Sequence, residues 1–206
     1  MKIVGGKYKG KEIKSISKSK DKEGLLRPTM EKVRKAFFDI LGDTIIDTYF
    51  LDLFAGTGAV GIEALSRGAK KVVFVEKAPK FARLIKENLE KLNIPEEKYE
   101  ILNMDFKEAL EYLTKRGDKF DFIYCDPPYE RKYYEEVIKL VKKGNLLNKY
   151  GILTLEDRKK RPVMWDYKKD VVETREYGAT RLMFLNFDDK EDFLWKVIKK
   201  FIIQVF

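Results

Sequence analysis

Hydrophobic residues recur along this chain with two different periods, and segments with the period of a strand alternate with segments with the period of a helix. Short runs rich in β-branched and aromatic residues predict strands, and apolar residues spaced at i, i+3, i+4 and i+7 predict helices. Thr29 is the expected N-cap of the first helix, and Gly42 is its expected end. The pattern predicts strands at 49–54, 71–75, 100–102, 120–125 and 151–155, and helices at 27–42, 59–66, 79–92, 107–113 and 133–141.

Five strands that alternate with helices predict a parallel sheet covered by helices on both faces. Two further strands, at 170–176 and 180–187, flank Tyr177-Gly178-Ala179, which has the composition of a hairpin turn. We therefore expect an α/β fold. Its centre would be a doubly wound, mostly parallel, Rossmann-like seven-stranded sheet with a C-terminal antiparallel hairpin.

The net charge of +9 is concentrated near the N-terminus. Residues 1–28 hold nine Lys or Arg residues against three acidic ones, which leaves +6 in this segment. Such a basic arm favours binding to a phosphate backbone through counterion release, and Lys7 and Lys9 are candidate contacts. A solvated arm that only aids solubility is the alternative. We expect three regions: a basic N-terminal arm and helix at 1–42, the main domain at 43–187 and an apolar tail at 188–206, which covers this sheet or a partner.

Residue usage excludes several classes of protein and of site. Cys125 is the only cysteine, so no internal disulfide forms, and a reducing cytoplasm fits this composition. No apolar run approaches the roughly 20 residues of a membrane span, and the N-terminus lacks the apolar core of a signal peptide. With no histidine and one cysteine, a zinc site is excluded and no metal is expected.

The first predicted strand runs into a glycine-rich loop. Gly56, Gly58 and Gly61 match the pattern G-x-G-x-x-G, and Glu76 follows Gly56 by 20 residues at the end of the second strand. Glycines allow a tight turn and a close approach of the backbone to a ligand, and the acid binds ribose hydroxyls. Dinucleotide-binding enzymes share this spacing, and a structural turn without a ligand is the other alternative.

Two acidic positions favour S-adenosylmethionine over a dinucleotide. Asp52 lies four residues before Gly56, where a carboxylate would bind an ammonium group but repel a pyrophosphate. Asp105 follows the third strand, where it would accept a hydrogen bond from an adenine amino group while Phe106 packs against the ring. An N-cap of the next helix is the alternative role for Asp105. The candidate cofactor residues are Asp52, Phe54, Gly56, Gly58, Glu76, Asp105 and Phe106.

The fourth strand leads into Asp126-Pro127-Pro128-Tyr129 at its carboxyl end, where open α/β sheets bind their ligands. An exocyclic amine on a base is a poor nucleophile because its lone pair is delocalised into the ring. The Asp126 carboxylate and the Pro127 carbonyl would each accept one amino hydrogen, and two prolines would hold these acceptors in place. Tyr129 offers a face on which a flipped base stacks. A proline turn with Asp126 as a cap is the alternative.

Cys125 precedes this motif directly. Methylation of RNA at cytosine C5 needs a cysteine nucleophile, which makes Cys125 a second candidate for chemistry. However, Cys125 lies within an apolar strand, and the chain has no histidine to lower the pKa of its thiol. We therefore expect a buried core thiol.

These motifs together resemble a known family, the bacterial 16S ribosomal RNA guanine-N2 methyltransferases, which are a branch of the class I methylases. DNA adenine-N6 enzymes share the glycine loop and the Asp-Pro-Pro-Tyr motif. The basic, glycine-containing arm and the helix that starts with Arg27-Pro28-Thr29 are typical of this family alone. The tail lies outside the family pattern. The resemblance covers roughly residues 1–187 and rests on segments 3–10, 26–38, 51–69, 126–129 and 177–182.

The resemblance implies a role for each matching residue. A simple helix start is the alternative for the Arg-Pro-Thr segment. The family usually has Asn where this chain has Asp39, so this chain departs from the family pattern at that position. The implied partner is 16S ribosomal RNA, within the small ribosomal subunit or its precursor. Asp52, Gly56, Gly58, Glu76 and Asp105 would contact S-adenosylmethionine, Asp126, Pro127 and Tyr129 would hold the guanine, and Arg27 and Thr29 would lie near the site.

Three other functions fit parts of the sequence. A DNA adenine-N6 methyltransferase would share the chemistry, but such enzymes usually carry a separate target-recognition segment. A NAD-dependent oxidoreductase would use the glycine loop and Glu76, but the chain has no histidine for hydride chemistry, and the Asp-Pro-Pro-Tyr motif would have no role. A non-catalytic RNA-binding module would rest on the basic arm alone. We expect transfer of a methyl group to N2 of a guanine in 16S ribosomal RNA.

Overall fold

The computed structural model describes residues 1–15, 26–127, 131–159 and 165–188, and a seven-stranded sheet forms its centre. The strands lie in the order β3-β2-β1-β4-β5-β7-β6. They are β1 (Tyr49–Asp52), β2 (Lys71–Val75), β3 (Tyr99–Leu102), β4 (Phe120–Cys125), β5 (Leu147–Arg158), β6 (Val171–Tyr177) and β7 (Thr180–Leu185). The first five strands pair in parallel, whereas β7 pairs in antiparallel fashion with β5 and β6. The predicted sheet and its C-terminal hairpin are confirmed.

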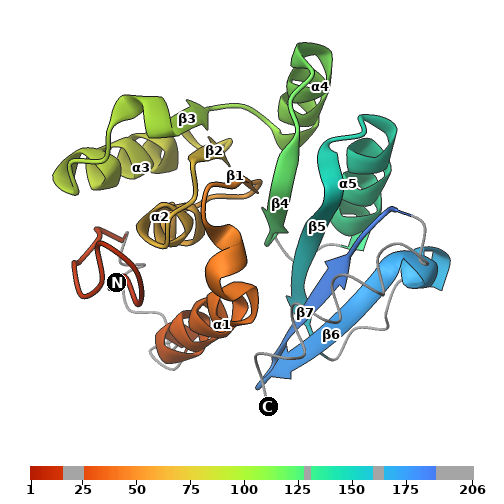
Figure 1. Cartoon of the computed structure of the whole chain (residues 1–206), viewed down its shortest axis with the longest axis horizontal. Coiled ribbons are helices and arrows are strands. Elements are labelled where there is room, and N and C mark those ends of the chain that lie inside the picture. Colours follow the sequence, from red (N-terminus) through yellow and green to blue (C-terminus); the bar gives the residue numbers. More distant parts are fainter. Residues whose placement is uncertain (16–25, 128–130, 160–164, 189–206) are drawn as a thin grey trace.

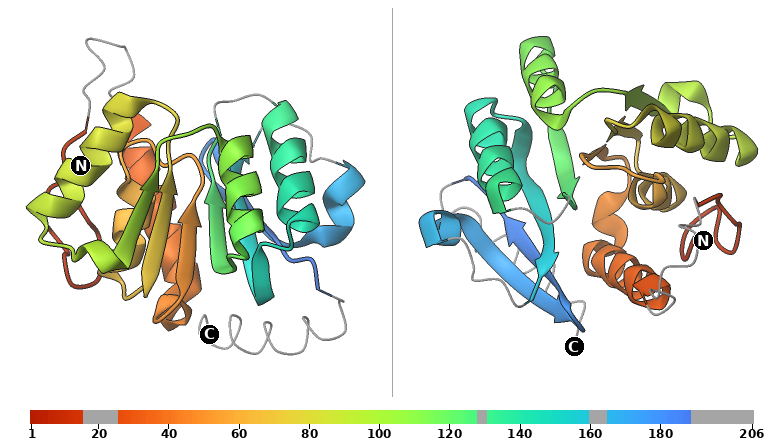
Figure 2. Two further views of the ribbon diagram at one scale, coloured as in Figure 1. Left: turned by 90° about the horizontal axis from the view of Figure 1, so that it is seen from above. Right: turned by 180° about the vertical axis from the view of Figure 1, so that it is seen from behind.

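Helices cover both faces of this sheet (Figures 1 and 2). One hydrophobic cluster joins three α-helices to the first face through residues such as Phe37, Ile62 and Ile85, and a second cluster joins two α-helices to the other face. No helix in the described residues has the length and apolar character that a membrane span requires. The helices of the first face are α1 (Leu26–Leu41), α2 (Ala59–Ser66) and α3 (Pro79–Lys91), those of the second are α4 (Phe106–Arg116) and α5 (Arg131–Lys143), and the 3-10 helices are η1 (Gly42–Ile45), η2 (Glu96–Lys98) and η3 (Trp165–Asp170).

The pairing of the central strands brings their ends together. On β4, Tyr124 belongs to the cluster beneath α1, α2 and α3, whereas Cys125 belongs to the cluster beneath α4 and α5. Tyr124 pairs with Asp52 of β1 and with Thr154 of β5, and Cys125 pairs with Leu155. The carboxyl ends of β1, β4 and β5 therefore meet along one edge of the sheet. We call this the carboxyl edge, and the opposite one, where the same strands begin, the amino edge.

The N-terminal arm is a hairpin-like segment that lies beside α2 and α3 (Figure 1). Lys2 and Glu12 form an antiparallel bridge. Ile3, Tyr8 and Ile13 are buried in the same hydrophobic cluster as α1. The arm is therefore docked on the domain through its apolar side chains, and the binding of RNA by its lysines stays a prediction.

A buried carboxylate on α2 anchors the arm. Glu63 is fully buried; it accepts a hydrogen bond from the Val4 N–H at 2.9 Å and forms ion pairs with Arg34 of α1 at 3.6 Å and with Arg67 at 3.0 Å. The arm also approaches α2 very closely, because a Cβ on Gly6, whose φ is +70°, would lie 1.8 Å from the backbone of α2. Glycine at this position is therefore required for the arm to dock.

The structure corrects two predictions about these elements. α1 begins at Leu26, so Thr29 lies inside the helix and is not its N-cap. β5 begins at Leu147, four residues before the predicted start, and extends to Arg158. The extension follows from pairing, because β5 has partners on β4 at its beginning and on β7 at its end.

Candidate active site at the carboxyl edge

The glycine loop connects the carboxyl end of β1 to α2. Gly56 and Gly58 have φ values of +53° and +78°, a region that residues with a Cβ rarely adopt. Gly61 lies against Phe74 of β2, where a Cβ would come within 2.2 Å of the aromatic ring. The first two glycines therefore permit the turn, and the third permits close packing of α2 on the sheet.

Asp52 ends β1 beneath this loop and is buried. Its Oδ2 accepts a hydrogen bond from the Gly61 N–H at 2.9 Å. Loss of hydration raises the pKa of Asp52 to about 7; this hydrogen bond opposes the rise, and the charge of Glu76 adds to it. Among the described residues, no ion pair compensates this carboxylate. A cationic group bound beside Asp52 would favour its ionised form at neutral pH.

Glu76 joins the end of β2 to the glycine loop. Its Oε2 accepts a hydrogen bond from the Gly56 N–H at 2.8 Å, and its Oε1 accepts one from the Ala78 N–H at 2.7 Å. Asn103, which follows β3, donates to the Glu76 carbonyl oxygen at 2.7 Å. The predicted ribose-binding acid is therefore held beside the loop by backbone groups on both sides, and each carboxylate oxygen keeps a lone pair for a further donor.

Asp105 follows β3 and is the N-cap of α4. Its carboxylate accepts a hydrogen bond from the Lys107 N–H at 3.1 Å and pairs with the Lys77 ammonium at 3.1 Å. Burial alone would raise the pKa of Asp105, but the hydrogen bonds and charges of Lys107 and Lys77 lower it. The helix cap considered in the sequence analysis is confirmed, and the contact with an adenine amino group stays a prediction.

Phe54 and Phe106 lie together beside the glycine loop. Their ring centroids are 5.2 Å apart, and the Phe106 ring also meets Tyr133 of α5 edge-on at 5.6 Å. Phe106 is buried and Phe54 is half-buried. The structure thus brings these two predicted cofactor residues into one aromatic cluster between the loop, α4 and α5.

Asp126 and Pro127 follow β4 at the carboxyl edge, where β4 lies next to β1. Asp126 is half-buried and Pro127 is buried. Burial raises the pKa of Asp126 well above its usual range, and the negative charges of Glu156 and Asp52 raise it further. Cys125 is fully buried, and loss of hydration raises the pKa of its thiol as well. The predicted core thiol is confirmed.

The side chains of three predicted site residues lie outside the described residues. Tyr129 lies outside the described residues. Arg27 and Thr29 belong to the first turns of α1, and their side chains lie outside the described part of the chain. The roles predicted for these three residues, and for the tail beyond residue 188, remain predictions.

The predicted RNA contacts of the arm lie away from the carboxyl edge. The Lys7 N–H donates to the carbonyl oxygen of Ser66, the last residue of α2, at 2.7 Å, and Lys9 follows two residues later. Because α2 starts at the glycine loop, these lysines lie at its far end. Lys14 lies nearer the loop: its N–H donates to Asn88 of α3 at 2.7 Å, and the Asn88 amide also donates to the backbone of the glycine loop at 3.3 Å. The arm thus extends along α2 from one edge of the sheet toward the other.

Glu156 of β5 is a site residue that was not predicted from the sequence. Its carboxylate accepts a hydrogen bond from the Tyr124 hydroxyl, and its carbonyl oxygen accepts one from the Tyr134 hydroxyl of α5 at 2.9 Å. One signal was available, since Glu156 directly follows the fifth apolar run just as Asp126 follows the fourth. Acidic residues in the same place after neighbouring parallel strands come close together in space.

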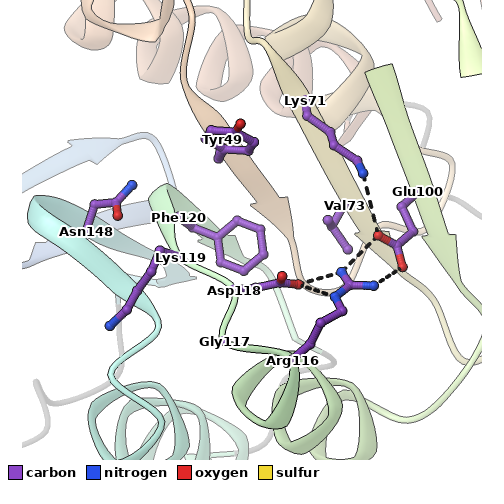
Figure 3. Close-up of a pocket in the computed structure, with 10 residues that line it drawn as sticks. All are labelled: Tyr49, Lys71, Val73, Glu100, Arg116, Gly117, Asp118, Lys119, Phe120 and Asn148. Carbon is purple, nitrogen blue, oxygen red and sulfur yellow. Dashed lines mark hydrogen bonds and ion pairs between the residues drawn. The ribbon is translucent and has the colours of Figure 1, made fainter. Parts of the chain in front are cut away.

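A cavity of about 330 Å³ lies at the amino edge, at the opposite end of the strands (Figure 3). Tyr49, Lys71 and Arg116 are among its lining residues. The Arg116 guanidinium makes five hydrogen bonds, which go to Glu100, Asp118 and Tyr112. Since a guanidinium has five N–H groups, none remains for an anionic ligand. Arg116 therefore braces the amino edge, and none of the predicted site residues lines this cavity.

Comparison with solved structures defines the class of the fold. The Escherichia coli protein yhhF is 26% identical and matches with a TM-score of 0.73, covering 89% of this chain and 96% of its own. The SAM-dependent methyltransferase from Agrobacterium tumefaciens, 16% identical, matches with a TM-score of 0.59, covering 76% and 61%, and shows the fold alone. The chain has the Rossmann-like fold of the class I methyltransferases.

Sequence comparison identifies the family. A family model described as conserved hypothetical protein 95 matches residues 1–186. The ribosomal RNA small subunit methyltransferase D of Haemophilus influenzae is 32% identical over 166 residues, which cover 80% of this chain and 82% of that protein. The chain belongs to the family that this model and this relative define, the ribosomal RNA small subunit methyltransferases D, and the resemblance seen in the sequence is confirmed.

Proposed function

We propose that this protein transfers the methyl group of S-adenosylmethionine to the exocyclic N2 of a guanine in 16S ribosomal RNA. The observation that carries the proposal is the parallel pairing of β1 with β4, which brings the glycine loop after Asp52 beside Asp126 and Pro127. Membership in a family with ribosomal RNA methyltransferases supports the substrate class. The substrate would be the small ribosomal subunit or its precursor, in the cytoplasm.

The chemistry of the carboxyl edge fits S-adenosylmethionine. Asp52 is a buried carboxylate whose hydration is lost, and the ammonium group of the cofactor would compensate its charge. A Cβ on Gly56 would meet no atom closer than 4.0 Å, so the space beside the loop is open. Glu76 borders the same loop and offers oxygens to ribose hydroxyls. When bound, the cofactor would supply a methyl group on a positively charged sulfur.

Asp126 and Pro127 provide the two hydrogen-bond acceptors that methylation of the guanine amino group requires. The lone pair of guanine N2 is delocalised into the ring, so the nitrogen must become pyramidal before it reacts. Acceptance of its two hydrogens by the Asp126 carboxylate and the Pro127 carbonyl favours that geometry and directs the lone pair toward the methyl group. The buried Pro127 fixes the backbone, so both acceptors are in place before the reaction. Tyr129 would stack on the flipped guanine.

The basic arm supports an RNA substrate. Lys14 lies near the glycine loop, and Lys7 and Lys9 lie near the other end of α2, so an RNA strand that reached the carboxyl edge and continued along α2 would meet both groups. Contacts to phosphates position an RNA without reading its sequence. This surface therefore favours a long or structured RNA over a free nucleoside.

The proposal is tested by the identity of the methylated product. The purified protein is incubated with tritiated S-adenosylmethionine and, in parallel, with small ribosomal subunits that lack the mark, with naked 16S ribosomal RNA and with duplex DNA. We expect label in ribosomal RNA, and mass spectrometry of the digested RNA should identify N2-methylguanosine. Label in DNA alone, or in another modified nucleoside, would contradict the proposal.

A further inference from the structure

Two carboxylates lie at the carboxyl edge within electrostatic range of one another: Asp126 directly follows β4, and Glu156 belongs to β5. Cys125, the last residue of β4, pairs with Leu155 of β5, and Asp126 and Glu156 are the residues that follow this pair on the two neighbouring segments. Neighbouring strands lie about 4.8 Å apart, and residues in one row of a parallel pair lie on the same face of the sheet. After burial, the charge of Glu156 is the next cause that raises the pKa of Asp126, as expected for this placement.

Glu156 is held in this position at both its side chain and its backbone. The Tyr124 hydroxyl donates to the Glu156 carboxylate, and the Tyr134 hydroxyl of α5 donates to the Glu156 carbonyl oxygen at 2.9 Å. Tyr124 is itself fixed, since its buried ring packs edge-on against Phe37 of α1 with centroids 4.8 Å apart. The Glu156 carboxylate therefore has a defined place beside Asp126.

Among the described residues, the groups that act directly on this pair are acidic or neutral, and Arg34 of α1 acts on Tyr124. Tyr124 of β4 donates to the Glu156 carboxylate, and the charges of Glu156 and of Asp52 of β1 act on Asp126. On the next residue of β5, Asp157 forms its own ion pair at 3.0 Å with Arg181 of β7. On β7, Leu182 is the partner of Glu156, and on α5 the Tyr134 hydroxyl donates to the Glu156 carbonyl oxygen.

Two poorly hydrated carboxylates at neighbouring positions share a proton at neutral pH, because ionisation of both carries a large cost. Burial raises the pKa of Glu156, but the hydrogen bond from Tyr124 lowers it and so favours the ionised form of Glu156. Burial raises the pKa of Asp126 well above its usual range, and the charges of Glu156 and Asp52 add to this effect. In the ligand-free protein the shared proton therefore resides mainly on Asp126.

We propose that Glu156 is a positioning residue for methyl transfer, which takes the shared proton from Asp126 when the amino group of the base arrives. This inference rests on the proposed function. Asp126 would then be ionised and able to accept an amino hydrogen. The nitrogen forms its bond to the methyl carbon while the carbon–sulfur bond breaks, and the electron pair of that bond stays on sulfur. The nitrogen passes its extra proton to Asp126, and the pair returns one proton to solvent as the product leaves.

The test is the pH profile of kcat/KM for methyl transfer by Glu156→Gln. Glutamine keeps the shape and still accepts the Tyr124 hydrogen bond, but it has no negative charge. Asp126 should then ionise more readily, so the acid limb of the profile should move to lower pH by about one unit or more. Tyr124→Phe should move it in the same direction by less, because Glu156 then holds the proton more readily.

The matched control is Glu100→Gln, the same change at the amino edge, which should leave the acid limb in place. An unshifted acid limb in an active Glu156→Gln protein would overturn the inference while leaving the proposed function intact. Absence of methyl transfer by the unaltered protein on every RNA would instead overturn the proposed function.

A second readout does not depend on activity. Because the pKa values of the pair are raised, the ligand-free protein binds more protons than the unfolded chain, and its free energy of unfolding should fall as pH rises through these values. Glu156→Gln should reduce the difference in this free energy between pH 5 and pH 8. An undiminished difference would mean that Asp126 and Glu156 are not coupled, and the inference would fail.

Discussion

The two edges of the sheet differ in whether their carboxylates are paired with cationic groups. At the amino edge, Arg116 is bound on both sides by Glu100 and Asp118, and each of these carboxylates has a cationic partner. At the carboxyl edge, the pKa values of Asp52, Asp126 and Glu156 are all raised by burial, and no ion pair among the described residues involves any of the three carboxylates. The two patterns occur at opposite ends of the same strands.

This difference indicates a structural role for the amino edge and a functional role for the carboxyl edge. The charged groups at the amino edge are paired within the protein, so Arg116 has no N–H group left for a ligand, although a cavity lies among these groups (Figure 3). Uncompensated carboxylates at the carboxyl edge cost stability in the ligand-free protein, and such a cost is typical of functional sites. A cofactor with an ammonium and a sulfonium group, together with an amine that donates hydrogen bonds, would supply what these carboxylates lack.

The largest expected effect is that of Asp126→Ala at the carboxyl edge. This variant removes one acceptor that is in place before the reaction, so methyl transfer should slow by about 10²-fold or more. Calorimetry should show that S-adenosylmethionine still binds, because the glycine loop and Asp52 are unchanged. Near-normal turnover in single-turnover measurements would exclude Asp126 from the chemistry and would remove the functional meaning of the carboxyl edge.

Asp52→Asn should exchange function for stability. The carboxyl group has a pKa near 3.8 in the unfolded chain and about 7 in the folded protein, so the folded state binds more protons between these values. Stability from Asp52 is thus present at low pH and is lost as pH rises from about 4 to 7. At pH 8 the Asn variant should be more stable than the unaltered protein by roughly 2–4 kcal/mol.

Urea unfolding at pH 4 and pH 8 measures this difference, which should vanish at the lower pH. The same variant should bind S-adenosylmethionine more weakly, since it lacks the charge that compensates the ammonium group. A variant that is less stable at pH 8 would show that Asp52 is already compensated in the ligand-free protein, and the contrast between the two edges would then fail.

The sequence predicted best those elements whose limits are set locally. The strands at 71–75 and 120–125 and the helix at 59–66 have the predicted bounds, because local signals set them. A β-branched run forms the first strand, prolines soon follow the second, and glycines flank the helix. The glycine loop was equally clear, since Gly56 and Gly58 are needed for their own backbone conformation. Features of this kind depend on neighbours in sequence.

Features that depend on neighbours in space were missed. β5 is longer than its apolar run because β4 and β7 supply hydrogen-bonding partners at its two ends. Glu156 belongs to no sequence motif, and its position at the site follows from the strand order that places β5 beside β4. Asp105 shows a third case, because the sequence allowed a helix cap and a ligand contact, and the structure shows the cap without testing the contact.

The smallest expected effect is that of Arg116→Met at the amino edge. Partly exposed ion pairs contribute little each, so loss of the contacts to Glu100 and Asp118 should lower the free energy of unfolding by only about 1 kcal/mol. Turnover should be unchanged, because no predicted site residue lines the cavity at the amino edge.

Arg83→Met is the matched control: Arg83 is an exposed arginine of α3 without an ion pair among the described residues, and its replacement should leave the free energy of unfolding and turnover unaltered. If Arg116→Met slowed methyl transfer while its stability loss stayed small, the amino edge would belong to the functional surface, and the division of the sheet into a bracing edge and a reacting edge would be wrong.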